Sequence, residues 1–373
     1  MIDQGVEPAA VDTMVENRWA DSTDVGLDSA WRQWSHFCAS RGFDASVRDN
    51  PSAVQVVNFL AAVRAGEFAS RKRGETLSAE WVRKVRSAVS IMVSIWGQRN
   101  VRIGAHPLVT CYIDSLVNDD YRVQDKRVYR YDDTWDVQLL FDFIRDNPAP
   151  VPGDSASAAD RALFLRRKRN HLLAVGRVVL ANRSSDMACI YRGHRSERNC
   201  IRLVRDEQEE LVSADVRFYR PKERNGLPVS SRGYTRWVSI PVIPDRRVCF
   251  ATLLEEYISL TEVFPIEDDL LFLSERPTAP HGHRLWGLSA ERLAKCMRSV
   301  MADAGIPEDF MAHSARHAGI ALRTSGADTA IALGYQTERW SDEAVMAHAR
   351  MSSKTYVTHY LRGIRAGEAD GSA

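Results

Sequence analysis

His313 and Arg316 lie three residues apart in the segment His313-Ser-Ala-Arg316-His317-Ala-Gly. We expect this segment to open a helix, and residues three positions apart lie on the same helical face. An imidazole can exchange a proton near neutral pH, and a guanidinium can bind an anion through two hydrogen bonds at once. The pair could therefore move protons beside an anionic group, although H-x-x-R alone does not specify a reaction.

Further polar residues gather where the chain is expected to turn. ANRSSDMACI places Arg183 and Asp186 three residues apart at the end of a predicted helix. FYRPKERNGLPVSSRGYTRWVSIPVI places Lys222 in the turn between two predicted strands. TERWSDEAVMAHARMSSKTYVTHYLRGI, close to the C-terminus, contains Trp340, His348 and two tyrosines. No single segment is specific, but their order along the chain is informative.

In this order the segments resemble those of the tyrosine recombinase (phage-integrase-like) family, over roughly residues 25–365. The family's catalytic domain carries an arginine with an acidic residue three places later, then a lysine between two strands, then H-x-x-R. A His or Trp and a tyrosine near the C-terminus follow. The resemblance implies a mostly α protein with a small antiparallel β-sheet (α+β), in which an N-terminal helical core-binding domain precedes a mixed α/β catalytic domain. The RSSD form is more similar to mobile-element recombinases than to chromosome-dimer resolvases.

The resemblance also implies a role for each candidate. A tyrosine hydroxyl, with a pKa near ~10, needs a proton acceptor and an activated phosphate before it can attack. Arg183 and Arg316 would hold the phosphate oxygens and stabilise the transition state, and Lys222 would protonate the leaving 5′ oxygen. His313 would relay protons, and Asp186 would orient the first arginine or the histidine. A 3′-phosphotyrosine conserves the bond energy, so we expect no ATP, metal or other cofactor, in agreement with the absence of G-x-x-x-x-G-K-[ST] and H-E-x-x-H.

The fourth element and the tyrosine each have two candidates. The family usually separates them by about nine residues, and the residue nine positions after Trp340 is Ala349. His348 is therefore our choice for the fourth element, with Trp340 as the alternative. We favour Tyr360 as the nucleophile because HYLRG resembles the family's tyrosine-hydrophobe-arginine ending, and Tyr356, one helical turn earlier, is the alternative. A third interpretation is that the nucleophile has been lost.

The elements ahead of these motifs predict a separate helical domain. Apolar residues recur at three- and four-residue steps in a helix after Ser78, and in two earlier helices around Trp34 and residues 54–63. The polar stretch that follows lacks this periodicity. We therefore predict a flexible leader at 1–24, a helical DNA-binding domain at 25–120, a linker at 121–130 and the catalytic domain at 131–373.

One edge of the helical domain is basic. Its cations are Arg71, Lys72, Arg73, Lys84 and Arg86. We expect them to contact DNA phosphates, although a solvated face is the simpler interpretation of any single one of them.

Composition limits the class of protein without identifying it. Lys+Arg number 50 and Asp+Glu number 49, so global charge gives no support for nucleic-acid binding. No apolar run is long enough for a membrane span, and the six cysteines are scattered. We expect a soluble intracellular protein of the cytoplasm, nucleoid or nucleus, depending on the host, with no small-molecule substrate.

The expected partner is double-stranded DNA, and the resemblance implies a homo-tetramer acting on two DNA sites. Three alternatives remain. A catalytically inactive protein of the same fold would bind DNA without forming a covalent adduct. A type IB topoisomerase-like enzyme would relax supercoils without paired sites. A helical interaction scaffold would show no DNA affinity at low salt.

Overall fold

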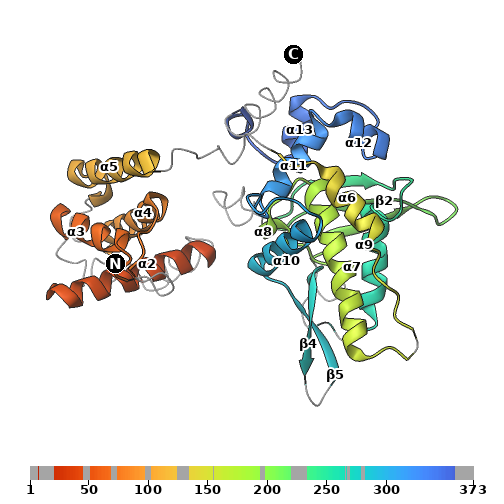
Figure 1. Ribbon diagram of the computed structural model, residues 1–373, viewed down its shortest axis with the longest axis horizontal. Helices are drawn as coiled ribbons and strands as arrows, with labels where there is room; N and C mark the ends of the chain where they lie inside the picture. The colour runs from red at the N-terminus through yellow and green to blue at the C-terminus, as the bar shows by residue number, and fades with distance from the viewer. Residues whose placement is uncertain are drawn as a thin grey trace. The chain divides into compact units, whose positions relative to one another are not determined.

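The structure is a computed structural model that describes residues 7, 21–44, 51–68, 74–96, 102–123, 134–153, 155–193, 198–219, 233–264, 266, 269–278 and 282–357. The chain divides into two compact units, Met1–Arg127 and Val128–Ala373, and each is described by itself. The structure is mainly helical, with a small three-stranded and a two-stranded antiparallel sheet (Figure 1). The predicted fold class, mostly α with a small antiparallel sheet, is confirmed.

The first unit is a bundle of helices around one apolar core. Its elements are α2 (Asp21–Arg41), α3 (Ala53–Arg64), α4 (Ala79–Trp96), the 3-10 turn η3 (Ile103–Ala105) and α5 (Pro107–Val123). The rings of Trp34, Phe37 and Phe59 meet in this core, with centroids 5.2–5.9 Å apart. Ser52 begins α3 with a reciprocal cap, because its hydroxyl accepts from the Gln55 N–H while the Gln55 side chain accepts from the Ser52 N–H.

The ends of two helices differ from the predicted boundaries. Helix α2 begins at Asp21, inside the range 1–24 predicted as a leader. Helix α5 continues to Val123, inside the predicted linker 121–130, and the boundary between the units falls after Arg127. The predicted start after Ser78 is confirmed, since its hydroxyl accepts from the Trp81 N–H at 3.3 Å.

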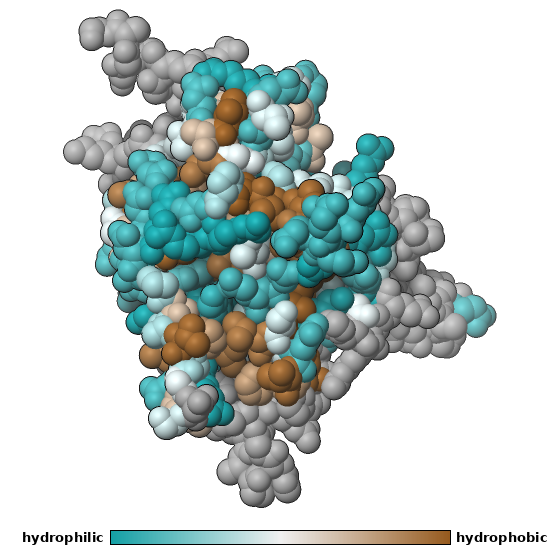
Figure 2. All heavy atoms as spheres, turned by 90° about the vertical axis from the view of Figure 1, so that its right-hand side faces the viewer, coloured by the Kyte–Doolittle hydropathy of each residue, from teal (hydrophilic) through white to brown (hydrophobic). Residues whose placement is uncertain are grey.

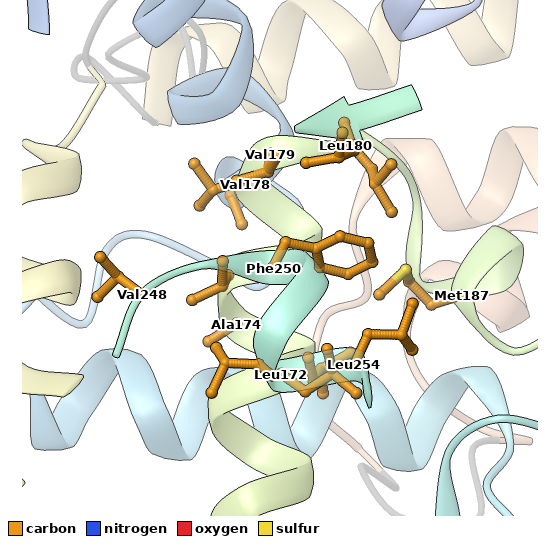
Figure 3. Packing of buried hydrophobic residues seen from close by; sticks show 14 of the residues in the cluster. Leu172, Ala174, Val178, Val179, Leu180, Met187, Val248, Phe250 and Leu254 are labelled. Atoms are coloured by element: carbon orange, nitrogen blue, oxygen red, sulfur yellow. The ribbon is translucent and has the colours of Figure 1, made fainter. Parts of the chain in front are cut away.

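Helix α7 (Ala158–Val179) forms the centre of the second unit. Its second half is buried on all sides and packs against α9 (Phe250–Glu262), as Figure 3 shows for Leu172 and Val178 around the Phe250 ring. A Cβ at Gly176 would come within 2.9 Å of that ring. Glycine therefore permits the close approach of the two helices.

The three-stranded sheet has the order β1 (Ile201–Arg205), β2 (Leu211–Val216), β3 (Val238–Pro241), and all pairs are antiparallel. Ala214, Val216 and Phe218 are buried, whereas Ser213, Asp215 and Arg217 between them keep some exposure. This alternation gives the sheet one face in the core and one toward solvent. The hairpin of β4 (Leu273–Thr278) and β5 (Gly282–Gly287) was not predicted, because prolines and charges interrupt its apolar pattern.

Short helices complete the second unit. They are α6 (Val137–Asp146), α8 (Ser184–Met187), α10 (Ala290–Asp303), α11 (Ser314–Arg323), α12 (Ala327–Leu333), α13 (Asp342–Ala349) and α14 (Ser353–Tyr356). In Figure 2, most of the described surface on the face shown is hydrophilic, with smaller hydrophobic patches between. Among the described residues, no helix is both long and apolar enough to cross a bilayer.

Candidate active site

A sharp turn at the end of α7 places Arg183. Ala181 adopts φ +45°, and with Asn182 it is fully buried, so the chain reverses inside the core. A left-handed conformation at a non-glycine residue costs roughly 1–3 kcal/mol and persists where the surrounding structure requires it. Arg183 then stands as the residue that precedes α8, and its backbone N–H donates to Asp186 Oδ2 at 3.1 Å.

Asp186 is the one acidic side chain that is buried among the described residues, at 1% exposure. Its Oδ2 accepts from Arg350 Nη2 at 2.6 Å and lies 3.9 Å from Arg183 Nη1. A buried carboxylate is stable as an anion only when it is paired and hydrogen-bonded. Asp186 therefore joins the predicted Arg183 to Arg350, which is distant in the sequence.

Helix α11 supplies His313 and Arg316. His313 is the residue that precedes the helix, and Arg316, 1% exposed, donates from Nη2 to the Ala349 carbonyl at 2.5 Å. A Cβ at Gly319 would lie 2.1 Å from the Val178 carbonyl oxygen, so α11 touches the backbone of α7 at this position. That contact brings Arg316 beside the turn that carries Arg183.

Arg177, which the sequence analysis did not identify, forms hydrogen bonds to residues beside both motifs. Its Nη1 donates to Ser184 Oγ at 3.0 Å and its Nη2 donates to the Ala312 carbonyl at 2.7 Å. Burial lowers the pKa of Arg177 to about 10, against the opposing attraction of Asp186, so the guanidinium stays charged at neutral pH. An arginine inside the apolar run HLLAVGRVVLA was the signal that could have identified it.

Arg350 is the second residue that was missed. It ends α13 in the left-handed conformation, with φ 53° and ψ 60°, and its guanidinium lies 4.0 Å from the centre of the Phe218 ring. Phe218 is buried and leads toward residues 220–232. Arg350 thus connects Asp186 to the strand from which the segment with Lys222 departs.

His313 faces a cluster of cations. The residue is exposed as a whole, yet atoms crowd its ring, and this desolvation, with repulsion by Arg177, Arg316 and Arg183, lowers the pKa of His313 to about 4. Its ring centroid lies 5.6 Å from that of His317, which is buried. At neutral pH the His313 imidazole is therefore uncharged and able to accept a proton.

His348 and Trp340, the two candidates for the fourth element, lie next to each other. Their ring centroids are 5.1 Å apart, and the His348 Nε2 donates to the Val179 carbonyl at 2.8 Å when that nitrogen carries the proton. Desolvation, and then repulsion by Arg323, lower the pKa of His348 to about 3. The Arg323 guanidinium lies 4.7 Å from the Trp340 ring. The two candidate side chains therefore form one cluster beside Arg323.

Tyr356 lies in a small apolar cluster with Ala349 and Ile320 and is 1% exposed. Its hydroxyl donates to Asp342 Oδ1 at 2.7 Å, and burial and that carboxylate raise the Tyr356 pKa. The hydroxyl is therefore hydrogen-bonded to an acid on α13 in this arrangement. Tyr360 and Lys222 lie outside the described residues.

Of the five cations predicted to contact DNA from the first unit, two are described. Lys84 is exposed and lies 3.7 Å from Glu80, and Arg86 is half-buried; both line a cavity of about 560 Å³ between α2 and α4. Arg71, Lys72 and Arg73 fall outside the described residues. The predicted basic edge thus stays a prediction.

The comparison with known proteins finds likeness only among solved structures, since no family model and no curated protein matches the chain. XerH site-specific recombinase bound to palindromic difH is 16% identical with a TM-score of 0.45, covering 86% of this chain and 72% of that one. A lambda integrase (75–356) dimer bound to a COC′ core site is 11% identical with a TM-score of 0.44, covering 91% and 93%. The integrase from mycobacterium phage Brujita is 16% identical with a TM-score of 0.25, covering 94% and 88%.

These matched structures are tyrosine recombinases. Sequence identities and TM-scores as low as these do not assign an activity to the present chain. The functional proposal therefore depends on the residues of the site.

Four of the positions at which the chain resembles tyrosine recombinases lie close together in the second unit. Arg183, Asp186, His313 and Arg316 come from two segments about 130 residues apart in the sequence and meet where α7 contacts α11. His348 joins them through Val179 and through its repulsion from Arg316. No cluster of potential metal ligands occurs among the described residues.

Proposed function

We propose that this protein is a site-specific DNA recombinase or integrase that cleaves and rejoins strands through a 3′-phosphotyrosine. The observation that carries the proposal is an imbalance of charge. Arg177, Arg183, Arg316 and Arg350 surround Asp186, the one buried carboxylate in the part of the chain that the structure describes. Buried cations in excess of anions favour a bound anion, and a phosphodiester offers two non-bridging oxygens to paired guanidiniums.

The role that we propose for each arginine follows from how exposed its side chain is. Arg183 keeps 27% of its side chain exposed and can reach a phosphate at the surface, whereas Arg177 is enclosed and holds the neighbouring backbone. Arg316 would complete the clamp, and uncharged His313 would take a proton from the attacking or departing oxygen. Lys222 would protonate the leaving 5′ oxygen. Tyr360 is our choice of nucleophile, and Tyr356 is the alternative.

The test is covalent trapping on nicked suicide duplexes made from the sequences that flank the protein's own gene. The wild type, Tyr360→Phe, Tyr356→Phe and Arg183→Ala would be compared on a denaturing gel. We expect the wild type to form an adduct that Arg183→Ala and one tyrosine variant lose. Tyr112→Phe, in the first unit, is the matched control and should keep the adduct.

Other outcomes discriminate the alternatives. Firm DNA binding without an adduct in any form would make the protein a DNA-binding module and refute the catalytic proposal. Relaxation of supercoiled plasmid without paired sites would favour a type IB topoisomerase-like enzyme. A homo-tetramer on two DNA sites belongs to the same proposal, and light scattering of the protein–DNA complex would measure it.

A further inference from the structure

Arginines and aromatic rings alternate along the β1–β2–β3 sheet and the segments beside it. We call this set the arginine–aromatic ladder, and its members are Tyr191, Arg198, Tyr219, Tyr234, Arg217, Trp237 and Arg202. None of them takes part in the site described above.

The ladder is continuous. The Arg217 guanidinium lies 3.6 Å from the Tyr234 ring centre and 4.4 Å from that of Trp237, and Arg202 covers Trp237 at 4.0 Å. Arg198 lies 4.7 Å from the Tyr219 ring centre. The Tyr219 and Tyr234 centroids are 5.2 Å apart and link the two halves. Such cation–π contacts are each favourable by about 0.5–1 kcal/mol at exposed sites.

The arginines of the ladder keep their charge available. Arg198 and Arg202 are exposed, and Arg217, which is half-buried, donates from Nε to the Asn199 carbonyl at 2.8 Å. Within the described residues, neither Arg202 nor Arg217 has a carboxylate within ion-pair distance. Asp215 stands opposite Arg202 in the strand register without forming such a pair. In the part of the chain that the structure describes, the charges of Arg202 and Arg217 are therefore not paired with a carboxylate.

Stacked guanidiniums suit a regular array of anions. Each ring restricts the plane of the guanidinium that covers it, so less side-chain entropy is lost when the edge N–H groups bind a phosphate. A protein partner would bury the aromatic rings themselves, but here arginines already cover several of them. Charge and geometry thus favour the backbone of a nucleic acid.

The ladder is continuous with the site. Tyr219 and Tyr234 pair across the base of segment 220–232, which contains Lys222. On the opposite face of the same strand, Phe218 contacts Arg350, the partner of Asp186. The backbone at residues 217–219 therefore connects the ladder to Arg350 of the site.

We propose that the arginine–aromatic ladder binds the phosphate backbone of the DNA flanking the cleavage position. This inference rests on the proposed recombinase function. It adds a second DNA-binding surface on the catalytic unit, formed by Arg198, Arg202 and Arg217.

The test measures DNA affinity and its salt dependence by fluorescence anisotropy on a labelled mixed-sequence duplex. The ladder variant combines Arg198→Gln, Arg202→Gln and Arg217→Gln. The control combines Arg246→Gln, Arg247→Gln and Arg298→Gln, which removes equal charge from exposed positions off the ladder. Each phosphate that is no longer neutralised should lower the slope of log affinity against log salt by roughly 0.9, so the slope of the ladder variant should fall by up to about 2.7. Arg202→Gln alone is measured as well. Because this position is exposed, the single variant tests the ladder even where the triple variant does not fold.

The outcomes separate the two proposals. A reduced slope in the ladder variant and in Arg202→Gln, with the control like the wild type, supports the ladder. Equal slopes in ladder and control variants overturn it, as does an unchanged slope with a changed oligomeric state, which would indicate a protein-binding face. Trapping in the same preparations reports on the recombinase proposal. A wild type that forms no adduct, together with a ladder variant whose slope is still reduced, would refute catalysis but not the ladder.

Discussion

At the scale of single residues, the pair between Asp186 and Arg350 is the most sensitive contact of the site. The Asp186 side chain is 1% exposed and the Arg350 side chain 10%, and their atoms are 2.6 Å apart. Removing one partner of a buried ion pair typically costs about 3–5 kcal/mol, and Arg183, whose Nη1 lies 3.9 Å from Asp186 Oδ2, keeps the cost of losing Arg350 at the lower end of that range. We therefore predict that Arg350→Ala lowers the free energy of unfolding by about 3 kcal/mol, measured by chemical denaturation.

The exposed pair of Arg339 and Asp328 is the control. Its distance is almost the same, 2.7 Å, but both side chains are more than two-thirds exposed. Arg339→Ala should cost less than about 1 kcal/mol, because water screens such pairs. Equal destabilisation in the two variants would contradict the importance given to burial at Asp186.

The surroundings of His348 lower its pKa, and this makes the stability of the protein depend on pH. The pKa of His348 falls to about 3 in the folded state. The ordinary histidine pKa is about 6.5, so below about pH 6.5 the His348 side chain gains a proton when the protein unfolds. Its stabilising contribution is complete above about pH 6.5 and is lost as the pH falls toward 3. His313 and His171 have lowered pKa values and act in the same direction.

We predict that His348→Gln makes stability less dependent on pH. Glutamine can still donate a hydrogen bond to the Val179 carbonyl but does not titrate. Between about pH 6 and pH 4, the slope of unfolding free energy against pH should be smaller by up to about 1.4 kcal/mol per pH unit. Denaturant titrations across this range measure the slope, and an identical slope in variant and wild type would show that His348 titrates normally.

At the scale of elements, the site depends on how closely α11 approaches α7. An alanine Cβ at position 319 would lie 2.1 Å from the Val178 carbonyl oxygen, well inside contact distance. Alanine is about 1 kcal/mol better than glycine in a helix interior, but it cannot fit here unless the helices separate. Gly319→Ala should therefore destabilise the protein and displace Arg316, with loss of the covalent adduct.

Gly26 provides the matched substitution. It lies inside α2, and a Cβ added there would meet nothing within 4 Å. Gly26→Ala should leave stability unchanged or raise it by up to about 1 kcal/mol. Calorimetry of both variants would test the contrast, and destabilisation by both would assign the effect to the backbone rather than to the helix contact.

Local patterns in the sequence predicted some elements well and others poorly. Helix α4 has a clear apolar period and follows Ser78 as expected, and strands β2 and β3 lie before and after Lys222 in the sequence as expected. The hairpin β4–β5 was missed because its order depends on pairing between strands rather than on a local pattern. Helices α2 and α5 extend into the ranges 1–24 and 121–130, which were predicted as leader and linker because they lack an apolar period.

The residues of the site likewise divide into those that local sequence patterns predicted and those that they did not. Arg183, His313 and Arg316 were predicted because each belongs to a short motif. Arg177 and Arg350 were missed because their importance comes from contacts with Ala312 and Asp186, which are 135 and 164 residues away in the sequence. The spacing of residues within a short motif does not predict contacts between residues so far apart in the sequence.

At the scale of the whole molecule, each unit has a core of its own. In the first unit the core gathers around Trp34 and Phe59, and in the second around α7 and α9. Among the described residues, each core is made of residues from its own unit. We expect each unit to fold when expressed separately, as its circular dichroism and cooperative thermal unfolding would show.

If both units contact one duplex, linking them should raise affinity beyond that of either part. The second binding event becomes intramolecular, which typically strengthens binding by 10²–10⁴-fold without any new contact. We predict that the full chain binds a mixed-sequence duplex at least about 100-fold more tightly than residues 1–127 or 128–373 alone, as measured by anisotropy at one salt concentration. Residues 128–373 binding as tightly as the full chain would show that the first unit, including Lys84 and Arg86, contributes nothing to DNA affinity. The prediction that residues 25–120 form a DNA-binding domain would then be wrong, whereas the proposed active site would be unaffected.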